Sequence, residues 1–170
     1  MMNILLVDGY NIIGAWPELT DLKERDLAAA RDRLIELMAE YQAFTGTRVI
    51  IVFDAQFVQG IARVFKNHKV EVIFTKENET ADERIEKMAI DLNNIKTQIQ
   101  VATSDFTEQW VIFGQGALRK SARELLIEMQ YIQGEIKKDV TKSTVKKPPS
   151  KIHLSEEVAE IFEKWRRGNL

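Results

Sequence analysis

The sequence contains no cysteine, only two histidines and three prolines, and no long apolar run. Without cysteine the chain cannot form disulfides, thiol-based catalytic sites or cysteine-ligated zinc and iron–sulfur centres. The two histidines, His68 and His153, are too few for a histidine-rich metal site. The longest apolar runs, 4–7 and 49–53, are far too short to cross a bilayer, and the N-terminus lacks the basic and apolar segments of a signal peptide. We therefore expect a cytoplasmic protein without a membrane partner.

The length and charge of the chain suggest one domain with an unusual tail. The 170 residues suffice for a single domain, or for one domain with an appendage, and 45% apolar residues can build a sizeable core. The net charge of −2 conceals a division: residues 1–117 carry 12 basic and 18 acidic side chains, whereas residues 118–170 carry 12 and 8. An acidic body followed by a basic tail requires a functional explanation.

Short apolar runs alternate with helical patterns in the first part of the chain. We expect buried strands at 4–7, 49–53, 70–74 and 99–102. Helices are expected from about 26 to 44, after the capping box Thr80–Glu83, from about 106 to 113, and after the capping box Ser121–Glu124. The alternation predicts an α/β fold with a mostly parallel central sheet of four to five strands and helices on both faces.

The C-terminal part has a different organisation. We predict one domain over residues 1–136, a basic linker over 137–153 and a C-terminal helix over 154–170. The linker has six lysines and one acid between 137 and 151. The last helix has an apolar stripe that includes Phe162 and Trp165, and we expect this stripe to dock on the domain.

Four aspartates occupy related places in this pattern. Asp8, Asp54 and Asp105 each follow a predicted strand, and Asp82 falls in the first turn of a helix that follows the third strand. Carboxyl ends of parallel strands meet at one edge of a sheet, so these carboxylates are expected to converge there. An aspartate after a strand is often only a turn former. Several together repel one another unless a cation is present, and oxygen ligands alone suit Mg²⁺ or Mn²⁺. The pattern favours metal-dependent hydrolysis of phosphodiesters.

Four short motifs carry a resemblance to a known family. They are Asp8-Gly9-Tyr10-Asn11, Phe53-Asp54-Ala55, Glu79-Thr80-Ala81-Asp82 and Ala102-Thr103-Ser104-Asp105. Their order and spacing over residues 1–130 resemble the NYN domain, the bacterial branch of the PIN-like nucleases. The whole chain, including 14–17 and 163–167, looks like the YacP group of Firmicutes, whose best-known member is a ribosome-associated endoribonuclease that cuts messenger RNA during translation.

The resemblance implies a PIN-like three-layer fold, RNA as substrate and specific roles for the acidic residues. Asp8, Asp82 and Asp105 match the acidic triad of the family and would hold Mg²⁺ or Mn²⁺. Asn11 matches a polar residue that would orient a metal-bound water or a phosphate. Asp54 matches a further acid, which would be either a ligand or an outer partner of the metal. The ribosome is a partner on the same grounds.

Contacts to RNA must come from cations outside the acidic edge. Arg119, Lys120 and Arg123 flank the start of the helix that Ser121 caps, and Trp16 lies in the loop after the first strand, where it would either stack on a base or fill the core. In the tail we predict contacts from Lys137, Lys138, Lys142, Lys146, Lys147 and Lys151, and Arg166 and Arg167 end the last helix.

Two other functions fit part of the pattern. A non-catalytic RNA- or ribosome-binding module would keep the fold without hydrolysis. A phospho-acceptor receiver domain would use Asp54 as the acceptor, but it would leave Asp82 without a role and lacks the paired acids after the first strand.

Overall fold

The computed structural model describes residues 2–55, 70–104 and 116–145, with 140–145 as backbone only. The chain divides into two compact units, residues 1–130 and 131–170. The sheet, its helices and the candidate site belong to the first unit. No helix in the described ranges is long and apolar enough to cross a membrane.

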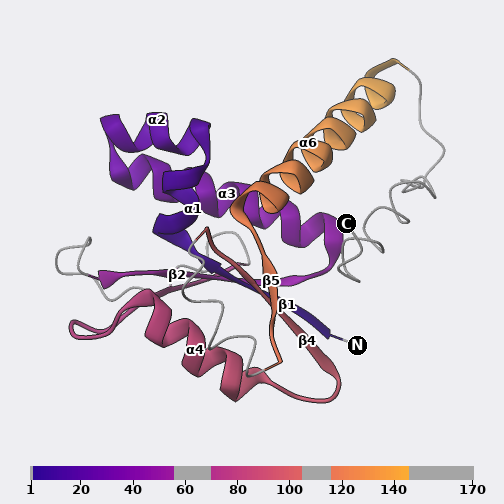
Figure 1. Ribbon diagram of the computed structural model, residues 1–170. Coiled ribbons are helices and arrows are strands. Elements are labelled where there is room, and N and C mark those ends of the chain that lie inside the picture. The colour runs from indigo at the N-terminus through magenta and orange to yellow at the C-terminus, as the bar shows by residue number, and fades with distance from the viewer. Residues whose placement is uncertain (1, 56–69, 105–115, 146–170) are drawn as a thin grey trace. The chain divides into compact units, whose positions relative to one another are not determined.

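The first unit is built on a five-stranded parallel sheet (Figure 1). Its strands are β1 (Met2–Asp8), β2 (Arg48–Phe53), β3 (Glu71–Phe74), β4 (Thr97–Ala102) and β5 (Leu118–Lys120). The spatial order is β3-β2-β1-β4-β5, and every neighbouring pair is parallel. The predicted α/β class and the four predicted strands are confirmed. The short fifth strand, within the predicted range of four to five, completes the sheet.

The strand order also rules out the receiver-like alternative. Receiver domains have the order 2-1-3-4-5, in which the first strand neighbours the third. Here β1 lies between β2 and β4 instead. Asp54 follows β2, which lies between β3 and β1. In a receiver domain the second strand is at the edge of the sheet, so the strand order around Asp54 does not match.

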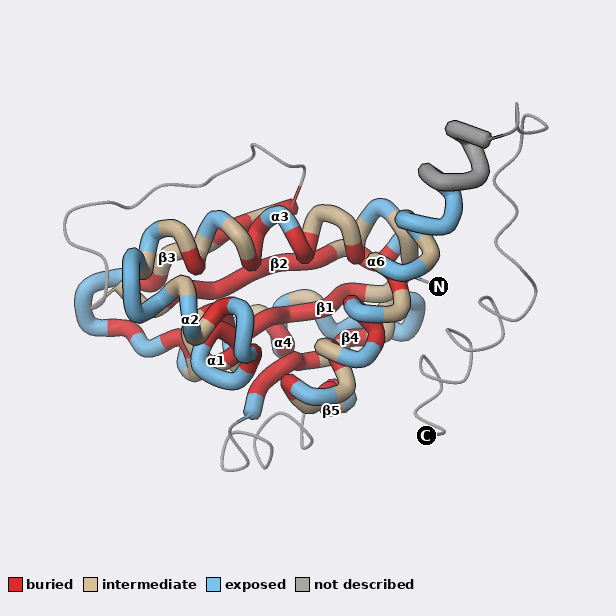
Figure 2. Tube along the Cα trace, turned by 90° about the horizontal axis from the view of Figure 1, so that it is seen from above, coloured by how far each residue is buried: buried red, intermediate tan, exposed pale blue. Residues whose placement is uncertain are grey.

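The apolar runs form strands because both faces of the sheet are covered. Ile4, Leu6, Ile50 and Val52 pack in a cluster with Ile85 of helix α4 (Ala81–Leu92). Their alternate neighbours, including Leu5 and Ile51, point to the other face and are also fully buried. Figure 2 shows β1 and β2 buried along most of their length and α3 buried along one side.

The helices cover the two faces unequally. On one face lie α1 (Gly9–Ala15), α2 (Pro17–Arg25) and α3 (Leu27–Thr45), which connect β1 to β2. On the other face lies α4, which leads from β3 to β4 (Figure 1). Right-handed crossovers require this arrangement, because the chain leaves β1 in one direction along the sheet and returns past it in the other.

Helix ends coincide with the residues that predict them. Asp26 caps α3 by accepting from the Ala28 amide at 2.9 Å, and Gly46 ends α3 with a φ of 73°. Thr80 accepts from the Glu83 amide at 3.2 Å at the start of α4. Ser121 accepts from the Glu124 amide at 3.0 Å at the start of α6 (Ala122–Val145). Both capping sites are confirmed.

The end of α6 differs from our expectation. We predicted a linker from residue 137, but the helix continues to Val145. Lys137 and Lys138 are exposed, and Lys138 lies 3.5 Å from Glu135 one turn earlier. Such pairs support a helix on its solvent side, and no proline or glycine occurs between Lys137 and Lys147.

Of the two roles predicted for Trp16, filling the core is confirmed and stacking on a base is wrong. Its side chain is 2% exposed, and its Nε1 donates to the Ala122 carbonyl oxygen at 2.8 Å. The indole N–H is satisfied inside the protein, as a buried tryptophan requires. This bond joins the α1–α2 corner to the first turn of α6.

Lys120 is also buried, so its prediction as an RNA contact is wrong. Its ammonium group pairs with the Glu128 carboxylate, and the two side chains are 5% and 2% exposed. The Tyr41 hydroxyl donates to Glu128 Oε2 at 2.8 Å and accepts from Lys120 Nζ at 3.2 Å. Burial raises the pKa of Glu128, and Lys120 opposes this only in part. Burial and the charge of Glu128 raise the pKa of Tyr41 well above its usual value. The three side chains join β5, α6 and α3.

Removing one member of this buried pair should destabilise the fold strongly. Lys120→Met leaves the Glu128 carboxylate buried without its cation, and we expect a loss of about 3–5 kcal/mol in the free energy of unfolding. The double variant Lys120→Met/Glu128→Leu should recover most of that loss. Lys138→Met removes an exposed pair on the same helix and should cost less than about 1 kcal/mol. Urea denaturation measures the free energy of unfolding of all three variants. Equal effects of the two lysine substitutions would contradict the importance of the buried Lys120–Glu128 pair.

Gly9 allows the chain to turn from β1 into α1 directly against Phe53. A Cβ at residue 9 would lie 2.3 Å from Phe53 Cε1. The Phe53 ring has little room to move, because it lies between Tyr10 and Phe74, with ring centroids at 5.0 and 5.6 Å. The residue after Asp8 must therefore be glycine.

Gly9→Ala should lower the free energy of unfolding by about 1–3 kcal/mol through overpacking. Gly14→Ala is the matched control in the same helix, because a Cβ there meets nothing within 4 Å. That change should be neutral or stabilise by up to about 1 kcal/mol. Chemical denaturation of the two variants checks this prediction, and a neutral Gly9→Ala variant would refute it.

Candidate functional site

The carboxyl edge of the sheet gathers polar residues from three strands. Asp8 is the last residue of β1 and pairs in register with Val52 of β2, and Asp54 follows β2. Val7 pairs with Ala102 of β4, so Ser104 lies beyond the end of β4 at the same edge. The chain leaves β1 toward β2 and leaves β4 toward β5, which makes the gap between β1 and β4 the switch point of the sheet. Ligands of such sheets bind at that point.

Asp8 lies at the centre of this edge. Its exposed fraction is 7%, and it occupies the N-cap position of α1 without a capping hydrogen bond from its side chain. The carboxylate is therefore not used as an ordinary helix cap, which is the usual structural reason for an aspartate after a strand.

Asn11 and Ser104 close the switch point. The Asn11 Oδ1 atom accepts hydrogen bonds from both the amide N–H and the hydroxyl of Ser104, which is 93 residues away in the sequence. Because a backbone amide can only donate, the accepting atom of Asn11 must be its oxygen. The Asn11 NH₂ group is then directed away from Ser104. The sequence did not predict this contact between Asn11 and Ser104.

Asp82 reaches the same edge on α4. The helix starts where β3 has ended, and Asp82 is a half-buried residue in its first turn. Since α4 leads back toward the start of β4, its first turn lies at the carboxyl edge. The partial positive charge of a helix N-terminus favours a carboxylate in this position.

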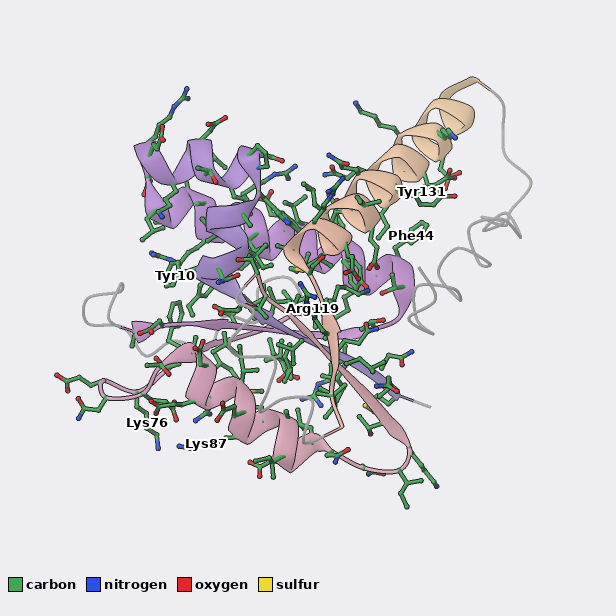
Figure 3. All side chains as sticks on the ribbon, viewed as in Figure 1. Tyr10, Phe44, Lys76, Lys87, Arg119 and Tyr131 are labelled. Carbon is green, nitrogen blue, oxygen red and sulfur yellow. The ribbon has the colours of Figure 1, made fainter. Side chains whose placement is uncertain are left out.

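Glu79 fixes the turn that precedes α4. Its side chain is 6% exposed and lies 3.0 Å from Lys87 Nζ and 3.6 Å from Arg84 Nη1. Figure 3 shows Lys76 and Lys87 on the same side of the molecule, at the turn and on α4. Burial raises the pKa of Glu79, but the hydrogen bonds from Lys87 and the Lys76 amide and the charges of Lys87 and Arg84 outweigh it, so the pKa is lowered. We infer that Glu79 anchors the helix that carries Asp82.

This lowered pKa makes Glu79 a source of acid sensitivity. A carboxyl group whose pKa falls on folding stabilises the folded protein at pH values above the pKa of the unfolded chain, here 4.5. This stabilisation is lost as the pH falls through the pKa of the folded protein. Glu79→Gln should therefore destabilise the protein at neutral pH, with a difference from wild type that shrinks in acid. Glu77→Gln, at an exposed position in the same turn, should show no such trend. Urea denaturation at several pH values measures both, and a pH-independent difference would exclude this role.

Tyr10 and Arg31 form a second polar contact at the edge, one that we did not predict. The ring of Tyr10 packs against Phe53, and its hydroxyl accepts from Arg31 Nη1 at 3.2 Å. Burial raises the pKa of Tyr10, Arg31 opposes this, and the charge of Asp54 adds to the rise. Asp54 and Arg31 therefore both act on the Tyr10 hydroxyl. Figure 3 shows Tyr10 next to α1 on the helix-rich face.

The described residues do not form a complete metal site. No group of three or more His, Cys, Asp or Glu side chains in the described ranges is close enough to hold a metal ion. Asp105, predicted as the third ligand, lies outside the described residues and follows Ser104 directly. The structure thus brings Asp8, Asp54 and Asp82 to one edge without testing the full predicted set.

The basic residues that we predicted to contact RNA differ in their exposure, and some lie outside the described residues. Arg123 is exposed in the first turn of α6, Arg119 is half-buried on β5, and Lys137 and Lys138 are exposed on α6. The side chain of Lys142 is not among the described ones. The remaining basic residues of the prediction lie outside the described ranges: Lys146, Lys147, Lys151, Arg166 and Arg167.

Comparisons with known proteins agree on one family. The model of the YacP-like NYN domain matches residues 5–167. The chain is 68% identical over 169 residues to the "Uncharacterized protein YacP" of Bacillus subtilis (strain 168), with 99% of each chain covered. It resembles the crystal structure of Rae1 (YacP) from Bacillus subtilis with a TM-score of 0.78 and 67% identity, covering 99% of this chain and 97% of that one. A tryptophan-to-leucine variant of Rae1 gives a TM-score of 0.76 at 65% identity, covering 98% and 96%.

Proposed function

The chain belongs to the YacP-like NYN domain family, whose domain is nuclease-like, and on this premise we propose that it is a metal-dependent endoribonuclease. The observation that carries the proposal is the position of Asp8, Asp54 and Asp82, from three separate segments, at the carboxyl edge of the sheet. Thr80 caps the helix that carries Asp82, and Thr75 accepts from the Ala55 amide in the turn after β2.

The proposed cofactor is Mg²⁺ or Mn²⁺, held by Asp8, Asp82 and Asp105, with Asp54 as a ligand or an outer partner. The donor chemistry supports this choice, because the edge offers carboxylate and amide oxygens and the chain has no cysteine. A bound ion of this kind supplies a reactive water and offsets negative charge on a phosphodiester.

Asn11 and Asp8 are both held in position before the substrate binds. Ser104 holds the Asn11 oxygen, so the Asn11 NH₂ group is oriented in advance and can donate to a phosphate oxygen or to the attacking water. Asp8, nearly buried at the end of β1, has little freedom to move. Pre-orientation of both groups lowers the entropy cost of assembling the reactive geometry.

The proposed substrate is messenger RNA, cut in association with the ribosome. The acidic edge repels a polyanion, so affinity has to come from cations elsewhere on the chain. The exposed Arg123, Lys137 and Lys138 fit this role, as do the basic residues of the tail. The ribosome as partner rests on the resemblance to the YacP group.

Neutralising the acidic edge should abolish cleavage. Asp8→Asn and Asp82→Asn keep the size of each side chain and should each lower the cleavage rate of RNA by at least a hundredfold. Asp91→Asn, an exposed position at the other end of α4, is the matched control and should cleave like wild type. The assay uses free RNA and translating ribosomes with Mn²⁺ or Mg²⁺, and then EDTA.

Three results would change this conclusion. Intact cleavage by Asp8→Asn and Asp82→Asn would end the metal proposal, as would full activity in EDTA. Binding of RNA or ribosomes without any cleavage would identify the chain as a non-catalytic binding module. Cleavage on ribosomes alone would show that the partner positions the RNA.

A further inference from the structure

Arg31 is a half-buried arginine held by a phenol rather than by an acid. It lies in the second turn of α3, and its Nη1 atom donates to the Tyr10 hydroxyl at 3.2 Å. In the part of the chain that the structure describes, no carboxylate forms an ion pair with Arg31, whereas Arg33, Arg48 and Arg84 each pair with a glutamate. The Tyr10 hydroxyl fixes the Arg31 guanidinium without cancelling its charge. The bond to Tyr10 uses one of the five N–H donors of the guanidinium.

The position of Arg31 links it to the carboxylate edge. Tyr10 stands between Asp8 and Asn11 in the chain, and its ring rests on Phe53, the last residue of β2. The start of α3 lies at the carboxyl edge, because α3 ends at Gly46 just before the beginning of β2. Arg31 therefore lies at the same edge of the sheet as Asp8, Asp54 and Asp82.

We propose that Arg31, oriented by Tyr10, binds a phosphate of the RNA strand next to the scissile phosphodiester. This proposal rests on the nuclease function proposed above and adds a positioning residue to it. Guanidinium groups bind phosphate through paired N–H donors, and a cation here offsets the repulsion between RNA and the carboxylates. The contact would hold the strand in register with Asp8 without taking part in bond cleavage.

The test measures binding of RNA as a function of salt. A fluorescein-labelled single-stranded oligoribonucleotide is titrated with the full chain in EDTA, and fluorescence anisotropy gives the affinity at several KCl concentrations. Arg31→Gln should weaken binding roughly tenfold, and the slope of log affinity against log salt should become shallower by about 0.7, the value for one phosphate on a single strand. Arg31→Lys keeps the charge and should keep the slope. Tyr10→Phe keeps the ring but not the acceptor, so it should weaken binding less than Arg31→Gln.

Arg33→Gln is the matched control two residues further along α3. Arg33 already pairs with Glu18 at 2.7 Å and Glu36 at 3.1 Å, so its loss should lower the unfolding midpoint and leave the salt slope unchanged. Arg31→Gln should make the salt slope shallower and leave the unfolding midpoint unchanged. An Arg31→Gln variant with wild-type affinity and slope overturns the proposal, and so does an equal change in slope for both variants.

Parallel cleavage assays with Mn²⁺ separate this proposal from the nuclease function. If Arg31→Gln raises KM while kcat is retained, both the nuclease function and the phosphate contact are supported. A wild-type chain that binds RNA with the expected Arg31 dependence but never cleaves it refutes the nuclease function and leaves the phosphate contact in place. A wild-type chain that cleaves while Arg31→Gln binds normally refutes only the contact. A chain that binds no free RNA also refutes the contact, whereas RNA as the substrate is decided by the cleavage assay on translating ribosomes.

Discussion

The parallel pairing of β1 with both β2 and β4 is the constraint on which the candidate site depends. This pairing fixes Asp8 opposite Val52 and brings the end of β1 beside the end of β4. Because both faces of β1 are buried, a shift of register by one residue would exchange the side chains that pack on α4 for those that pack on the other face, so the close packing of the strand determines the position of Asp8. The switch of direction between β1 and β4 then opens the gap that Asn11 and Ser104 bridge. The site is thus a product of strand order as much as of the residues in it.

Buried polar contacts hold the helix-rich face against this sheet. Trp16 bonds to the start of α6, and Lys120, Glu128 and Tyr41 connect β5, α6 and α3. A buried ion pair often contributes little more than a well-packed apolar pair, but it tolerates few alternative arrangements. We infer that these contacts specify which helix lies on which strand, whereas the apolar core supplies the stability. The acidic edge needs this precision because its carboxylates come from separate segments.

The sequence predicted the parts of the fold that depend on local patterns. Continuous apolar runs indicated the buried strands, and the side chains of Thr80 and Ser121 marked the starts of helices, because each signal is contained within a few residues. The positions of Asp8 and Asp54 at strand ends and of Asp82 in the first turn of α4 followed from the strand pattern. The sequence left the burial of Trp16 as one of two alternatives and did not indicate that of Lys120, since their partners lie far along the chain; Trp16 and Ala122 are 106 residues apart. Nor does a three-residue strand such as β5 produce a recognisable pattern.

The same limit applies to charge, and it changes how the cations of this chain should be interpreted. Counting charges by segment assigned RNA binding to the C-terminal part, including Lys120, yet that lysine is neutralised inside the protein. Arg33, Arg48 and Lys87 are likewise matched to glutamates. A cation contributes to binding a polyanion mainly when the protein has not already supplied its counter-charge, because replacing one salt bridge by another gains little. By this criterion Arg31, which lies in the acidic part of the chain, is a stronger candidate for contact with RNA than Lys120 in the basic part. The net charge of a segment describes its solubility and its long-range attraction, but the ion pairs of the fold decide which charges meet the substrate.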